Sequence, residues 1–299
     1  MASGVAEWIK RGEGRAPQLT WSFVAEAPLV ALRYAWETGA TLAADEVGGL
    51  YHLDRKGRLV GLTRGPSPIR ALGWSDTGQG GIALVGDDKL YWFDRNLNFH
   101  GWIEHPEPVL GAALDAHGNY AAISTSSCTT LIYNSDRKVV RKFGTMQPSS
   151  SLRFLIHQPA LLSVTEYGLL CCHQLDGEPL WQQQLYANVG DMAATGDGQT
   201  ILLACYSHGI QCHNGRGSQV GSYQVGGTVC RIATGFLAGR IAAATVERHF
   251  YYIDSDGDVI WQATLPDEIV RLHCDPYGFG VICGLQSGRI VRLDWNRTE

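Results

Sequence analysis

The strongest constraint on this chain is a repeat of 40 residues that runs through most of its 299 positions. Four short apolar segments end in aspartates that are separated by multiples of 40 residues, namely Asp54, Asp94, Asp254 and Asp294. The three intervening positions carry the related polar residues Asn134, Gln174 and Asn214. A fixed period of this length is typical of repeat architectures, in which each repeat forms one supersecondary unit.

Two apolar columns follow the same period, with no insertion between residues 28 and 294. The first column contains Leu32, Leu72, Ala112, Leu152, Met192, Ile232 and Leu272. The second contains Leu42, Ile82, Ala122, Leu162, Leu202, Ala242 and Ile282. Apolar residues that recur at one position of every unit predict a buried core that all units share.

Each unit reads as four short strands separated by turn residues. In the sixth unit we predict strands near 228–234, 239–246, 249–254 and 258–264. Short β-rich runs at this spacing favour an all-β fold, and 36 glycines suit many tight turns. The Asp or Asn that ends the third strand fits the first position of a type I turn, where its side chain bonds nearby backbone. These repeated acids are therefore interpreted as turn residues and not as catalytic groups.

A four-stranded sheet cannot bury both of its faces alone, so neighbouring units must stack. Seven such units predict a seven-bladed β-propeller of four-stranded antiparallel blades, an arrangement that leaves only short, protected edges. The predicted blades cover about 28–64, 68–104, 108–144, 149–185, 188–224, 228–264 and 268–295.

The last of these blades has only three strands of its own. Trp21 falls in the same repeat column as Trp181 and Trp261, which lie on predicted outer strands. We therefore expect strand 18–24 to pair with strand 288–294 and to complete the seventh blade from both ends of the chain. Residues 1–17 are expected to form an N-terminal tail, and residues 18–297 a single propeller domain.

Two segments carry a resemblance to known repeats. IDSDGDVIWQATL at 253–265 and LDGEPLWQQQL at 175–185 resemble the Asp–x–x–Gly–x–x–x–Trp pattern of PQQ-like repeats, and over about residues 18–297 the repeat length and strand pattern also resemble WD-repeat propellers. The Gly-His and Trp-Asp dipeptides of typical WD repeats are absent, and other blades replace the tryptophan by Gly61, Gly101, Arg141 and Gly221. The resemblance implies the propeller superfamily but no particular activity, because one fold serves many functions.

Cys171 and Cys172 are the first candidates for chemistry, since PQQ-dependent dehydrogenases often carry a disulfide between adjacent cysteines beside the cofactor. Here both cysteines lie in the predicted strand LLCCHQ, where neighbouring side chains face opposite sides of the sheet. Two buried thiols that pack as small apolar groups are the interpretation we favour. No cofactor is expected.

A second candidate is the segment CYSHGIQCH, which contains the metal-ligand types Cys205, His208, Cys212 and His213. Their spacing is not that of a standard structural zinc site, so no metal site is predicted. The sequence also lacks a Gly-x-Ser-x-Gly elbow, a P-loop and a His-Glu-x-x-His helix. It therefore favours a function without catalytic residues.

The first predicted strands of several blades carry cations that would lie close to the propeller axis. They are Arg33, Arg70, Arg153, Arg231 and Arg271, and Asp191 shares a repeat column with the last two. Arginines around a narrow channel suit the binding of a carboxylate, a phosphate or an acidic peptide. The alternative is that they bridge neighbouring blades or bond inner backbone carbonyls, since buried cations are commonly paired.

Charge and hydropathy limit the classes of partner. A net charge of -5 gives no support to nucleic-acid binding, and no apolar run is long enough to predict a membrane span. The N-terminus lacks a secretory signal, so we expect a cytoplasmic protein with reduced cysteines. The predicted function is a protein-interaction platform that presents one propeller face to an unidentified protein partner. The alternative is a sensor or enzyme that binds a small anionic ligand in the central channel.

Overall fold

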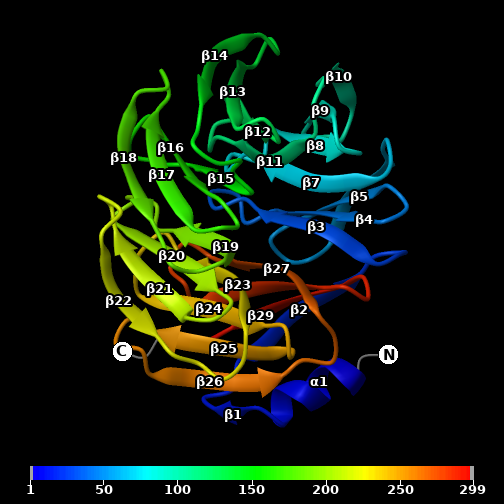
Figure 1. The fold of residues 1–299 in the computed structure, drawn as a ribbon. Helices are drawn as coiled ribbons and strands as arrows, with labels where there is room; N and C mark the ends of the chain where they lie inside the picture. Colours follow the sequence, from blue (N-terminus) through cyan, green and yellow to red (C-terminus); the bar gives the residue numbers. More distant parts are fainter. Residues whose placement is uncertain (1–2, 297–299) are drawn as a thin grey trace. The chain divides into compact units, whose positions relative to one another are not determined.

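The computed structural model describes residues 3–296. The chain divides into two compact units. The middle unit is Ala25–Tyr186, and the terminal unit combines Met1–Val24 with Ala187–Glu299. Each unit is built from antiparallel sheets of four repeat strands, and one sheet of the terminal unit has a fifth strand at its edge (Figure 1).

The middle unit contains four sheets, each formed by four consecutive strands. The first sheet contains β3 (Leu29–Tyr34), β4 (Thr41–Asp45), β5 (Gly49–Leu53) and β6 (Leu59–Arg64). The second contains β7 (Ile69–Trp74), β8 (Gly80–Val85), β9 (Lys89–Asp94) and β10 (Phe99–Glu104). The third contains β11 (Val109–Leu114), β12 (Tyr120–Thr125), β13 (Thr129–Asn134) and β14 (Val139–Gly144). The fourth contains β15 (Ser151–Phe154), β16 (Ala160–Val164), β17 (Leu169–Gln174) and β18 (Pro179–Gln184).

The terminal unit contains the remaining three sheets and the elements that precede them. The fifth sheet contains β19 (Val189–Ala194), β20 (Thr200–Cys205), β21 (Gly209–Asn214) and β22 (Gln219–Tyr223). The sixth contains β23 (Val229–Thr234), β24 (Arg240–Thr245), β25 (His249–Asp254) and β26 (Val259–Thr264). The seventh contains β27 (Ile269–Cys274), β28 (Gly280–Leu285), β29 (Arg289–Asp294) and β2 (Gln18–Val24). The helix α1 (Ser3–Lys10) and the short strand β1 (Glu13–Gly14) come before β2.

These seven sheets are the seven predicted blades, and they confirm the all-β fold class. In the sixth blade the four observed strands lie within one residue of their predicted bounds. The first strand of each blade packs beside the first strand of the next, in the order β3, β7, β11 and β15 in the middle unit. In the terminal unit the order is β19, β23 and β27.

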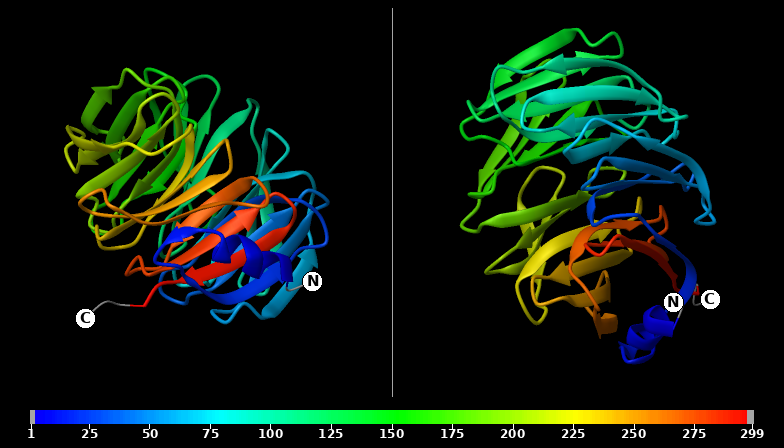
Figure 2. Two further views of the ribbon diagram at one scale, coloured as in Figure 1. Left: turned by 90° about the horizontal axis from the view of Figure 1, so that it is seen from below. Right: turned by 90° about the vertical axis from the view of Figure 1, so that its right-hand side faces the viewer.

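The seventh blade is closed by the N-terminal strand, as the sequence predicts. β2 pairs antiparallel with β29, with Gln18 opposite Asp294 and Val24 opposite Arg289. Figure 2 shows these two strands, blue and red, side by side in both views. The backbone hydrogen bonds of one sheet therefore join the two ends of the chain.

Asp54, Asp94 and Asp254 have the predicted turn role, whereas the carboxylate of Asp294 accepts hydrogen bonds from the side chains of Thr20 and Arg292. The side chain of Asp54 accepts hydrogen bonds from the backbone amides of Lys56 and Arg58, at 2.8 and 3.0 Å. The amide of Gly57 donates to the carbonyl of Asp54 at 2.9 Å, and Gly57 has a positive φ of 73°. The same arrangement recurs one repeat later at Asp94, where Leu97 takes the position of the glycine. The carboxylates of Asp54 and Asp94 therefore bond the backbone amides of the turns that follow them.

The segment 1–17, which the sequence predicts as a tail, holds α1 and β1 against the sixth blade. Trp8 and Ile9 are buried, and the Trp8 indole lies 5.7 Å from that of Trp261. β1 adds a fifth strand to the sheet by pairing with β26. A Cβ on Gly12 would lie only 2.5 Å from the Trp261 indole nitrogen, so the chain passes directly over this ring. Helix α1 and strand β1 therefore cover a tryptophan that lies on the outermost repeat strand.

Candidate functional site

Three charged residues occupy one repeat column on neighbouring strands of the terminal unit. Asp191 lies on β19, Arg231 on β23 and Arg271 on β27, and all three are half-buried. Each of the three residues comes directly after a β-bulge, at which the pairing register of its strand shifts. A bulge turns the next side chain out of the regular alternation. We call Asp191, Arg231 and Arg271 the charged row.

The first two members of the charged row bond to the next strand. Asp191 accepts hydrogen bonds from the backbone amides of Met192 and Ile232, at 3.0 and 3.2 Å. Arg231 donates from Nε to the carbonyl of Val270 and from Nη1 to the carbonyl of Cys230, both at 2.8 Å. These contacts match the interpretation in which the charged side chains bridge neighbouring blades.

Arg271 differs from the other two. Its guanidinium makes no hydrogen bond or ion pair with any residue in the described part of the chain. Burial lowers the pKa of Arg271; the negative charge of Asp191 counteracts this, while the nearby Arg231 cation lowers the pKa further. A cation is thus held in a confined position next to a second cation, with its five N–H donors available.

The three arginines predicted in the middle unit have separate surroundings. Arg33 donates to the carbonyl of Leu32 at 3.2 Å. Arg70 is exposed and forms an ion pair with Asp87, which lies between β8 and β9. The guanidinium carbon of Arg153 lies 5.2 Å from the centre of the Trp36 ring, a cation–π distance. Arg33 therefore bonds its own strand, Arg70 pairs with a loop aspartate, and Arg153 lies over an aromatic ring.

Three exposed apolar side chains lie on adjacent loops of the fourth blade. They are Tyr186, Met146 and Tyr167, whose exposed fractions are 93%, 74% and 69%. The amide of Leu185 donates to the carbonyl of Gly168 at 2.6 Å, which joins the loop of Tyr186 to that of Tyr167. We call Met146, Tyr167 and Tyr186 the blade-four loop surface.

The loop of Met146 is tied to the same turn. Gln147 accepts a hydrogen bond of 2.9 Å from the Thr165 hydroxyl, and Gln182 contacts the Met146 sulfur at 3.5 Å. The loop segments 144–150, 164–168 and 184–186 contain a single charged residue, Glu166. Sequence reasoning missed this surface, although Tyr167 and Tyr186 in predicted turns were a usable signal.

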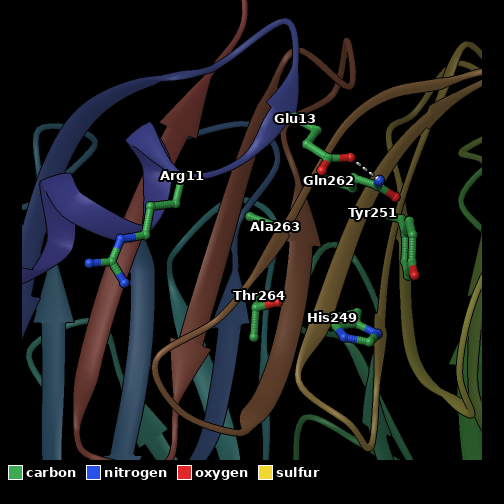
Figure 3. A pocket seen from close by; sticks show the side chains of 7 residues that line it. All are labelled: Arg11, Glu13, His249, Tyr251, Gln262, Ala263 and Thr264. Carbon is green, nitrogen blue, oxygen red and sulfur yellow. Dashed lines mark hydrogen bonds between the residues drawn. The ribbon is translucent and has the colours of Figure 1, made fainter.

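A polar hollow of about 240 Å³ lies between the N-terminal segment and the sixth blade (Figure 3). Its lining residues are Arg11, Glu13, His249, Tyr251, Gln262, Ala263 and Thr264. Gln262 donates to the carboxylate of Glu13 at 2.8 Å, and Arg11 and His249 stand on opposite sides. Nothing in the repeat pattern predicts the hollow, because two of its residues precede the first repeat.

The cysteine candidates and His213 lie on strands of the sheets, whereas His208 is exposed on the turn between β20 and β21. Cys171 and Cys172 are free thiols, and burial raises the pKa of each to about 11. Both ring nitrogens of His213 have an oxygen within hydrogen-bonding distance, the Gly217 carbonyl at 2.9 Å from Nδ1 and the Gln211 amide oxygen at 3.3 Å from Nε2. Across residues 3–296, no three His, Cys, Asp or Glu side chains are grouped so as to hold a metal ion.

The single helix in the described residues is too short to cross a lipid bilayer.

Comparison with known proteins identifies the fold class. No protein-family model and no curated protein sequence matches this chain. Among solved structures, the chain is similar to the β-propeller domain of Cps50 (Swd1) from Myceliophteria thermophila, a WD40 propeller. The TM-score is 0.81 with 15% sequence identity, over 94% of this chain and 100% of that domain. The protein is a seven-bladed β-propeller, and at this identity the likeness extends to the fold alone.

Proposed function

We propose that this chain is a non-catalytic protein-interaction platform that binds its partner through the blade-four loop surface. The observation that carries the proposal is the exposure of Met146, Tyr167 and Tyr186 on three loops that hydrogen bonds hold together. Exposed apolar side chains that are scattered singly need no explanation, whereas grouped ones are typical of interaction sites. These three side chains lie on loops between strands, so the packing of the sheets does not require them to be apolar.

The residue types also suit protein recognition. Tyrosine and methionine are enriched at protein interfaces. A tyrosine ring offers a large rigid contact area together with one polar group, and a methionine adapts to an irregular partner surface. Since Glu166 is the one charge on these loops, the partner is recognised by apolar packing and amide hydrogen bonds. Binding of this kind is little affected by salt, which screens charges.

Affinity capture from native extract tests the proposal. The variant Y167S/Y186S removes two exposed rings, and the variant V220S/L237S is a matched control, since Val220 and Leu237 are exposed by 62% and 58% on the terminal unit. We expect the same proteins to be enriched by the wild type and the control at low and high salt, and to be lost with Y167S/Y186S. Thermal melting of all three proteins establishes that they are folded. Equal enrichment by Y167S/Y186S would contradict the proposal.

A further inference from the structure

We infer that Arg271, together with Arg231, forms a binding site for a small oxyanion in the terminal unit. This inference concerns another part of the molecule than the proposed interaction surface and does not depend on it. The ligand class is a phosphate or a carboxylate, because each offers a pair of negatively charged acceptor oxygens that matches two N–H donors of a guanidinium.

The first observation is the unequal use of the three members of the charged row. Both carboxylate oxygens of Asp191 accept backbone amides, and two donor groups of Arg231 bond backbone carbonyls. The side chains of Asp191 and Arg231 thus each link the first strand of one blade to the first strand of the next. Arg271 makes no such link, because its guanidinium bonds no residue in the described part of the chain.

The second observation is the charge of the row. Two arginines and one aspartate give a net charge of +1, and the carboxylate is already engaged by two N–H donors. The negative charge of Asp191 acts on Arg271, but it can balance only one of the two arginines, so one buried positive charge of the row remains uncompensated. An anion that bonds the fork of Arg271 and the remaining donors of Arg231 would supply the counter-charge at a site of increased local potential.

The third observation is the position of the charged row within the repeat. Blades one, two and three have the same bulge before the same repeat position, but there the residues are Ala31, Ala71 and Gly111. The bulge therefore belongs to the fold and does not require a charged residue after it. The repeat does not specify the residue type at this position, and three consecutive blades carry a charged residue there, on β19, β23 and β27.

Titration calorimetry of the full chain tests the site, with inorganic phosphate and succinate as separate probes at low ionic strength. We expect saturable binding of at least one probe, and the preferred probe identifies the ligand class. R271Q should weaken that binding about tenfold or more, because a charge-assisted pair of hydrogen bonds is lost. R271K, which keeps the charge but loses the fork, should weaken it less. R216Q is the matched control, since Arg216 is an exposed arginine on the β21–β22 turn.

A second measurement avoids the variants. Phenylglyoxal modifies accessible arginines, and mass spectrometry of the wild-type peptides reports the extent at each one. We expect the bound probe to protect Arg271 and to leave Arg216 equally modified. Absence of saturable binding of both probes, binding that R271Q leaves unchanged, or modification of Arg271 that the bound probe does not slow would each overturn the inference.

Discussion

The backbone amide of Phe236 donates a hydrogen bond of 2.7 Å to the carbonyl of Pro276, the residue that lies one repeat later. The amide of Gly196 makes the same bond to the carbonyl of Phe236 at 2.9 Å, and in the middle unit Asp76 bonds Ala116 at 2.8 Å. The 40-residue period thus reappears as hydrogen bonds between the inner loops of adjacent blades. Because backbone atoms make these hydrogen bonds, the side chains of the loop residues can differ from blade to blade.

The first prediction concerns the space beside this loop. A Cβ on Gly196 would lie 2.0 Å from the Phe236 ring, so G196A forces the ring or the loop to move. We expect a loss of about 1–3 kcal/mol in the free energy of unfolding, as for other overpacked sites, measured by urea denaturation. G221A is the control, because no atom lies within 4 Å of that added Cβ. Equal stability of the two variants would contradict this account of the packing.

The second prediction concerns the N-terminal segment. Trp8 is buried against Trp261, so W8A should lower the free energy of unfolding by about 3 kcal/mol, in the range found for buried tryptophans. Deletion of residues 1–15 should also lower the melting temperature, and deletion of residues 1–24 should lower it further because β2 is lost. E7A is the control, since Glu7 forms only an exposed ion pair with Arg11. If the shorter deletion melts like the full chain, α1 does not contribute to stability.

The third prediction concerns a strained turn. Arg248 has a positive φ of 67°, whereas the equivalent positions one or more repeats away include Gly48, Gly168 and Gly288. A side chain in this left-handed region costs about 1–2 kcal/mol relative to glycine. Since glycine also loses more entropy on folding, we expect R248G to raise stability by about 0.5–1 kcal/mol. R216G, at an exposed arginine whose φ is not positive, should lower it, and calorimetric melting compares the two.

The fourth prediction concerns acid stability. The backbone amide of Thr228 donates to Glu247 at 2.8 Å and its hydroxyl donates at 2.9 Å, and these bonds lower the pKa of Glu247 from 4.5 to about 2. A carboxyl whose pKa is lower in the folded state stabilises the fold above pH 4.5, and this contribution is lost as the pH falls through 2. E247Q should therefore be less stable than the wild type near pH 6, and the difference should vanish near pH 2. Urea midpoints across this range measure it, and a constant difference would show that ionisation of Glu247 is not involved.

The charged row was partly predictable from sequence. The repeat column places Asp191, Arg231 and Arg271 at one register, and the structure brings them onto neighbouring strands. The column does not reveal that Arg70 pairs with Asp87 or that Arg153 lies over Trp36, because both partners come from other positions of the repeat. Side chains as long as arginine reach several neighbours, and packing selects among them.

The sequence by itself determined the seven blades, their strand order, their turn acids and the closing strand, because a periodic apolar pattern repeats the same local solution seven times. Only the tertiary structure decided the rest. The N-terminal segment lies outside the period, so its packing on Trp261 depends on contacts between residues far apart in sequence. The exposure of Tyr186 depends likewise on its three-dimensional neighbours, and so does the lack of a hydrogen bond from the Arg271 guanidinium to any residue within 3–296. A repeat specifies positions in a strand, whereas exposure and hydrogen bonding are properties of the three-dimensional surroundings.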